Sequence, residues 1–194
     1  MTVKLNCSSS GSVALSAPAS TNSGADIVLN LPSDAGSLDR LERAGNILQV
    51  VTASTSTEVA ITALTYADSG LSASITPSSA TSKILVMVDQ QFQIFKTGTN
   101  TFAGIKLLRN AVTIVEPITD AAGPFNLGVS ATGSSAVGFW SNFNCTFLDN
   151  PNTTSSVTYK TQARPYASGT TLKLQQAATP TNGSSRIVLM EVSA

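Results

Sequence analysis

The sequence predicts an all-β protein in which a short-strand N-terminal segment, residues 1–45, precedes an antiparallel β-sandwich of the jelly-roll kind, residues 46–194. Apolar and polar residues alternate in about eight to ten short runs, spaced roughly 8–12 residues apart. Ser and Thr form about a quarter of the chain, and the branched Cβ of Thr fits a pleated surface. Only residues 34–45 have a helical pattern, of one or two turns, which Gly45 ends.

The N-terminal segment contains two short alternating runs, residues 13–15 and 27–31, each followed closely by a proline. A pair of strands alone is at best marginally stable in water. Their apolar side chains therefore need a partner outside the segment, and cyclic closure of three copies would bury all three strand faces. We expect trimerisation or attachment to a larger particle through Leu15, Ile27, Leu29 and Leu31.

The first half of the sandwich is expected to hold four strands, at residues 47–52, 58–65, 71–76 and 83–95. A turn at 68–70 (DSG) precedes the third of them. The fourth is the longest, and its two faces differ. Ile84, Val86, Val88 and Gln90 share one face, whereas Leu85, Met87, Asp89 and Gln91 share the other.

The second half begins with a hairpin of residues 101–108 and 112–115 around Asn110, a residue suited to a left-handed turn position. Residues 121–135 are rich in Gly, Ala and Ser and predict a long loop. The next strand, 136–148, directs its phenylalanines inward and Trp140 outward. Strands are then expected at 157–164, 171–176 and 186–192, with a loop around 182–183 before the last.

The composition argues against several function classes. The chain has no histidine, which removes the commonest general base and the commonest metal ligand. Ser82 and Lys83 could form a Ser/Lys pair in principle, but neighbouring strand residues point to opposite faces. Eleven basic residues balance eleven acidic ones without a basic run, so no nucleic-acid interface is predicted. We expect no catalytic residues, no cofactor and no metal.

Acidic residues can act as glycosidase catalysts where two of them lie about 5–10 Å apart in a cleft. The interior candidates are Asp89, Glu116, Asp120 and Asp149. Asp89 is the least expected, because it lies in a strongly apolar strand. It could be a buried ion-pair partner, a polar residue at a trimer axis or an acid catalyst, in that order of preference. The sequence shows no convergent pair.

Trp140 lies in the aromatic run 138–143 (GFWSNF). If Phe139 and Phe143 face inward, Trp140 faces outward, and an exposed tryptophan commonly marks a protein interface or a sugar-stacking platform. Packing within the core or between subunits is the first interpretation, and ligand stacking is the second.

Cys7 and Cys145 lie far apart in the sequence. Two free thiols in a reducing compartment are favoured over a disulfide. No run reaches the ~20 apolar residues of a membrane helix, so neither membrane insertion nor standard secretion is expected. We expect synthesis in a host cytoplasm.

Several short runs resemble a recurrent tail-fibre module of bacteriophages, notably cyanophages and other marine phages. They lie at 13–18 (VALSAP), 27–36 (IVLNLPSDAG), 45–51 (GNILQVV), 75–86 (ITPSSATSKILV), 147–151 (FLDNP) and 189–192 (LMEV). The resemblance implies a homotrimeric virion appendage with an N-terminal mounting segment and a C-terminal β-sandwich knob. It contributes no catalytic residue. Because tail fibres are usually longer than this chain, a short fibre, a fibre tip and a capsid decoration all stay open.

The leading hypothesis is therefore a non-enzymatic phage protein, a trimeric tail fibre located in the virion. Its partners would be copies of itself, another virion protein (a tail adaptor or nozzle, or the capsid) and a host surface glycan or protein. The alternative is a capsid decoration or head-fibre protein that stabilises the shell. A glycan depolymerase and a soluble lectin-like module are weaker alternatives.

Overall fold

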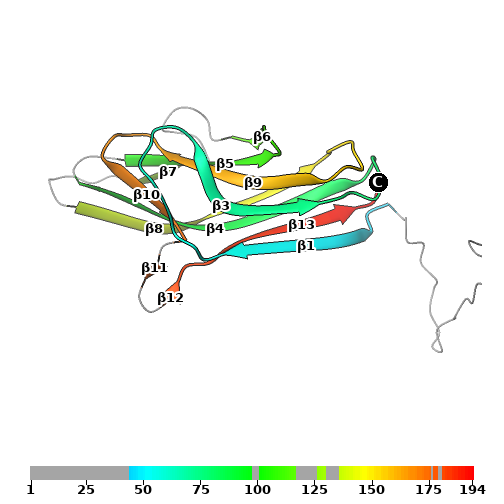
Figure 1. The fold of residues 1–194 in the computed structure, drawn as a ribbon, viewed down its shortest axis with the longest axis horizontal. Helices are drawn as coiled ribbons and strands as arrows, with labels where there is room; N and C mark the ends of the chain where they lie inside the picture. Colours follow the sequence, from blue (N-terminus) through cyan, green and yellow to red (C-terminus); the bar gives the residue numbers. More distant parts are fainter. Residues whose placement is uncertain (1–43, 98–100, 117–125, 130–135, 176, 179–180) are drawn as a thin grey trace, which may run out of the picture. The chain divides into compact units, whose positions relative to one another are not determined.

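A computed structural model describes residues 44–97, 101–116, 126–129, 136–175, 177–178 and 181–194 (Figure 1). All of them belong to the second of the two units into which the chain divides, Asp39–Ala194. Several sequence-based predictions lie outside these residues. They are the two N-terminal strands, nearly all of the predicted helix, the role of Leu15, Ile27, Leu29 and Leu31, and the state of Cys7. The division at residue 45 also stays a prediction.

The prediction of an all-β sandwich is confirmed, since the described ranges contain thirteen strands and no helix. The first sheet has the order β1-β13-β4-β10-β2, and β8 pairs with the other edge of β4. Its strands are β1 (Ile47–Thr55), β2 (Val59–Ile61), β4 (Lys83–Thr97), β8 (Ala136–Asp149), β10 (Thr170–Leu174) and β13 (Ser185–Val192). At fifteen residues, β4 is long enough to pair with β13 along its first half and with β10 along its second half.

The second sheet has the order β3-β9-β5-β6, with β7 pairing the first residues of β5. Its strands are β3 (Ala67–Ile75), β5 (Thr101–Arg109), β6 (Val112–Val115), β7 (Asn126–Val129) and β9 (Val157–Pro165). A separate two-residue pairing joins β11 (Ala177–Ala178) to β12 (Thr181–Asn182). All of these pairings are antiparallel.

The two sheets form a jelly roll. Strands β1-β13-β4-β8 make one layer and β3-β9-β5-β7 make the other, as Figure 1 shows. This is the eight-stranded double-sheet arrangement of a jelly roll. The sequence could not supply this order, because pairing partners such as β1 and β13 are more than a hundred residues apart.

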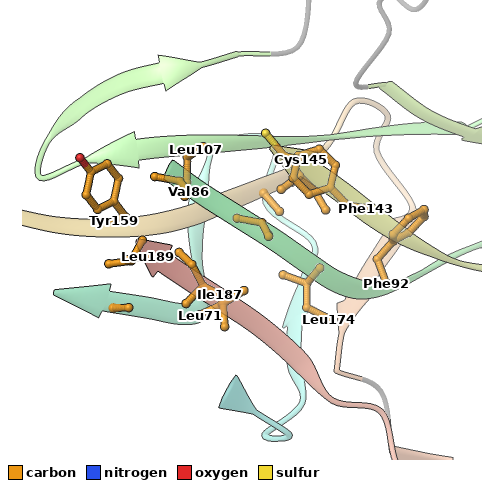
Figure 2. Packing of buried hydrophobic residues seen from close by; sticks show 14 of the residues in the cluster. Leu71, Val86, Phe92, Leu107, Phe143, Cys145, Tyr159, Leu174, Ile187 and Leu189 are labelled. Carbon is orange, nitrogen blue, oxygen red and sulfur yellow. The ribbon is translucent and has the colours of Figure 1, made fainter. Parts of the chain in front are cut away.

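The core lies between the two layers, and strict alternation produces it. In β9 and β13 every second residue is buried. Figure 2 shows the interdigitated side chains, with Phe92 and Phe143 of the first sheet and Tyr159 of the second among the largest. The predicted faces of β4 are confirmed, since Ile84, Val86, Val88 and Gln90 are buried and their neighbours point outward.

Four local predictions were wrong. The segment expected as a strand at 58–65 pairs only at Val59–Ile61. The run 68–70, expected as a turn, lies inside β3, where the register with β9 shifts between Asp68 and Ser72. This is a β-bulge, and Gly70 takes the positive φ of 81° that favours glycine. The expected loop 121–135 contains β7, and the expected loop around 182–183 contains β12.

Candidate functional site

The outer face of the first sheet carries an unusually apolar surface across four strands. The register aligns Val50 of β1 with Met190 of β13, Leu85 of β4 and Leu148 of β8. In the neighbouring row, Val188 lies beside Met87. Val50, Met87 and Leu148 are 53%, 41% and 51% exposed. We call this surface the apolar stripe: Val50, Leu85, Met87, Leu148, Val188 and Met190.

A polar row borders the stripe. It consists of Ser54, Arg186, Asp89 and Asn144, one from each of the same four strands. Arg186 and Asp89 are opposite in register, so both signs of charge are present in this row. An apolar centre with a polar margin is the usual anatomy of a protein–protein interface.

Asp89 lies in this margin, and its first interpretation as a buried ion-pair partner was wrong. The side chain is exposed and accepts a hydrogen bond from Asn142 Nδ2 at 2.9 Å. The polar side chain in an apolar strand is explained by its position on the outer face, where the stripe ends.

Further along the same outer face lies an aromatic platform, defined as Phe95, Trp140 and Gln93. Trp140 of β8 is 58% exposed and Phe95 of β4 is 42% exposed, so the outward orientation expected for Trp140 is found and packing inside the core is excluded. Gly138 makes room for the indole, because a Cβ there would lie 3.1 Å from the Trp140 ring and 3.2 Å from Gln93 Nε2.

A shallow hollow of about 300 Å³ adjoins the platform. It is lined by Gln93, Phe95, Thr171 and Lys173. The Lys173 ammonium group pairs with Glu58 at 3.0 Å. An exposed ring beside an amide, a hydroxyl and a charged pair can stack on a flat ligand and hydrogen-bond its edges.

Of the other acidic candidates, Glu116 is exposed and Asp120 lies outside the described residues, whereas Asp149 is held in structural contacts. Asp149 accepts two hydrogen bonds from Arg109 Nη1, at 3.0 and 2.9 Å, and one from the Tyr159 hydroxyl at 2.6 Å. It therefore ties the end of β8 to β5 and β9 of the other sheet. Ser82 is buried whereas Lys83 is exposed, as expected for opposite faces.

Neither metal chemistry nor thiol chemistry is indicated in the part of the chain that the structure describes. No group of three or more Asp, Glu, Cys or His side chains there could hold a metal ion. Cys145 is a buried free thiol, and its burial raises the pKa of the sulfhydryl group. No helix among these residues has the length and apolarity needed to cross a bilayer.

The apolar stripe was not predicted from the sequence. Its members were visible only as the outward half of four alternating patterns, such as Leu85 and Met87 in residues 83–95. Because the four strands come from distant parts of the chain, the pattern of one strand cannot show that its outer residues adjoin those of the others.

Comparison with known proteins identifies no family. No family model matches the chain, and no curated protein matches it. One similar solved structure is that of the infectious bursal disease virus Gx strain, with 12% identity and a TM-score of 0.25. The match covers 75% of this chain, which spans 38% of that one.

Proposed function

We propose that this chain is a non-enzymatic structural protein of a bacteriophage virion, most specifically a trimeric tail fibre whose β-sandwich knob contacts the host surface. The observation that carries the proposal is the apolar stripe. Three side chains of the stripe are exposed and the other three are half-buried, and a soluble monomer rarely leaves a contiguous apolar surface of this kind uncovered. The stripe supports the proposal that the sandwich functions as part of an assembly.

Sister subunits are the partner proposed for the stripe. The chain has zero formal net charge and only 11% charged residues, so little electrostatic repulsion opposes self-association. The polar margin contains Arg186 and Asp89, so a second copy can offer each charge its opposite. Closure around a threefold axis would bury all three copies of the stripe without leaving an open end.

Contact with the host surface is proposed for the aromatic platform. It lies on the same outer face as the stripe but further along β4 and β8, so one part of the face can serve assembly while another meets a ligand. Three copies of a weak site would bind a host surface together far more tightly than one copy.

Light scattering of the full chain tests the assembly. We expect a trimeric mass at micromolar concentration and a monomeric mass for Leu148→Lys, because an ammonium group would be buried unpaired at the interface. Ser72→Lys is the matched control, since Ser72 is exposed on β3 of the opposite sheet, and it should stay trimeric. A monomeric parent chain, or a Leu148→Lys chain that stays trimeric, would contradict the proposal.

Electron microscopy of purified virions tests the location. Density for this protein on the tail supports a tail fibre, whereas density spread over the capsid would replace it with the decoration role. Either pattern is compatible with the trimer, so the two tests are independent.

A further inference from the structure

The outer face of the second sheet carries a cluster of two cations and two tyrosines, well away in the fold from the apolar stripe of the first sheet. Lys106 comes from β5 and Arg164 from β9, while Tyr66 and Tyr166 lie just before β3 and just after β9. We call these four residues the tyrosine–cation cluster.

Local alternation and register bring the cluster together. Arg164 lies between two buried residues of β9 and therefore points outward, and Lys106 does so in β5. Arg164 is opposite Gly104 in the pairing of the two strands. A Cβ on Gly104 would lie 2.6 Å from the Tyr166 hydroxyl and 3.0 Å from the Tyr66 hydroxyl. The absent side chain is therefore what allows both hydroxyls to converge over this strand.

The two cations stack on the rings rather than pairing with acids. Lys106 Nζ lies 4.3 Å from the centre of the Tyr66 ring, and Arg164 Cζ lies 4.9 Å from the same centre. Arg164 Cζ is also 4.6 Å from the centre of the Tyr166 ring. Neither cation forms an ion pair with a carboxylate among the described residues. Two like charges over one ring repel each other unless an anion joins them.

A carboxylate of the same sheet, that of Asp68, is already engaged. Asp68 accepts hydrogen bonds from Lys160 Nζ at 3.0 Å and from Gln162 Nε2 at 2.7 Å. These bonds, with that of Gln162 foremost, lower the pKa of Asp68, so the group is ionised at neutral pH. The charge of Asp68 is thus matched by Lys160, and no such match exists for the cations of the cluster among the described residues.

The cluster also contains hydrogen-bond donors without acceptors. Arg164 Nη1 donates to the Leu64 carbonyl oxygen at 3.0 Å, but the Nε atom of Arg164 is buried and makes no hydrogen bond to a described group. The Tyr166 hydroxyl is likewise buried and makes no hydrogen bond of ordinary geometry there. Burial and the neighbouring Tyr166 hydroxyl raise the pKa of Tyr66. Its phenol therefore stays protonated and can donate. Buried donors without acceptors are costly, so an acceptor is expected here.

We propose that the tyrosine–cation cluster binds the oxyanion group, carboxylate or phosphate, of an acidic saccharide. The oxygens would accept from the Lys106 ammonium group and from the guanidinium group of Arg164, both on half-buried residues, and the anion would neutralise two repelling charges. Only the choice of a saccharide as the carrier rests on the proposed contact with a host surface. The anion site itself stands on the contacts above.

Calorimetric titration of the full chain with D-glucuronate, glucose 6-phosphate and glucose tests this proposal. We expect one or both anions to bind and glucose not to bind, and the stronger of the two identifies the preferred oxyanion. Arg164→Gln should lower the affinity for the preferred anion at least tenfold, and Lys106→Gln should lower it about fivefold. Lys160→Gln is the control on the same face, because Lys160 already pairs with Asp68. The affinity of this variant for the anion should stay within twofold of the value for the parent chain.

Two further readouts separate a binding role from a structural one. If Arg164→Gln fails to fold, Lys106→Gln carries the test, because Lys106 is partly exposed and makes one ring contact. Binding should also weaken with added salt. Equal binding of glucose, no binding of either anion at 20-fold molar excess, or unchanged affinity in Lys106→Gln would overturn the proposal. Loss of binding in a chain that still trimerises would leave the assembly proposal intact.

Discussion

Asp149 shows how single residues hold the two layers of this sandwich together. Its carboxylate is buried at 7% exposure and receives donors from Arg109 and Tyr159, both of the opposite sheet. Because burial and the neighbouring carboxylate raise the pKa of Tyr159, that phenol is held as a donor. An acid that resembled a catalyst in the sequence is therefore a bridge between sheets.

Asp149→Asn tests this bridge. The substitution leaves the Arg109 guanidinium, which is partly exposed, without its counter-charge, and we expect a loss of about 2–3 kcal/mol in the free energy of unfolding. Urea denaturation of the two chains would measure it. The same substitution at exposed Asp89 should change the free energy by no more than about 0.5 kcal/mol. Equal effects at both positions would show that the bridge contributes little.

At the scale of elements, Glu191 fastens the connection between β3 and β4 onto β13. Its buried carboxylate accepts hydrogen bonds from the Ser78 backbone N–H at 2.8 Å, from Ser78 Oγ at 2.7 Å and from Gln49 Nε2 at 2.5 Å. Burial raises the pKa of Glu191, but hydrogen bonds from Gln49, Ser78 and Ser82 outweigh it and lower the pKa from 4.5 to about 2. One carboxylate thus links three segments.

The lowered pKa gives stability a pH dependence of known sign. A carboxyl group whose pKa is lower in the folded state stabilises the fold fully above about pH 4.5, and the contribution disappears as the pH falls toward 2. We expect Glu191→Gln to be less stable at pH 6 and to lose less stability between pH 6 and pH 2.5. Urea unfolding at several pH values measures both, with exposed Glu116→Gln as the control. If the free energy of unfolding of Glu191→Gln fell with pH as steeply as that of the parent chain, the pH dependence would not come from Glu191.

At the scale of the molecule, the described residues of the two sheets share one hydrophobic core. All members of the buried cluster lie between Ile61 and Leu189. We therefore expect the sandwich to fold without the N-terminal segment, whose proposed role is attachment.

Deletion of residues 1–45 tests this separation. We expect the remaining chain to be soluble, to unfold cooperatively and to be absent from purified virions, because the proposed mounting segment is gone. Circular dichroism and immunoblotting of particles would measure the two effects against the full chain. A truncated chain recovered on virions would show that attachment lies elsewhere, and an unfolded one would show that the domain division is wrong.

Much of the fold follows from local sequence. The alternation of residues 83–95 identified the buried and exposed sides of β4, and Asn110 adopts the positive φ of 54° expected at the hairpin turn. The wrong predictions of secondary structure lie where a few residues decide the backbone conformation. The bulge at Gly70 resembles a turn because both use glycine at positive φ, and β7 was missed in a segment rich in Gly, Ala and Ser.

The candidate sites divide in the same way. The outward position of Trp140 could be predicted, because successive side chains of a strand point to opposite faces and the neighbouring Phe139 was expected to face inward. The tyrosine–cation cluster could not, because Arg164 meets Gly104 through a pairing of strands sixty residues apart.

The sequence alone determined most of the long strands and which of their residues face inward, because a strand repeats every two residues and that period is written locally. The tertiary structure alone decided the jelly-roll order, the continuity of the apolar stripe and the convergence of two cations on two tyrosines. Those features depend on which distant strands pair and in which register. That choice is made when all the apolar faces are buried together.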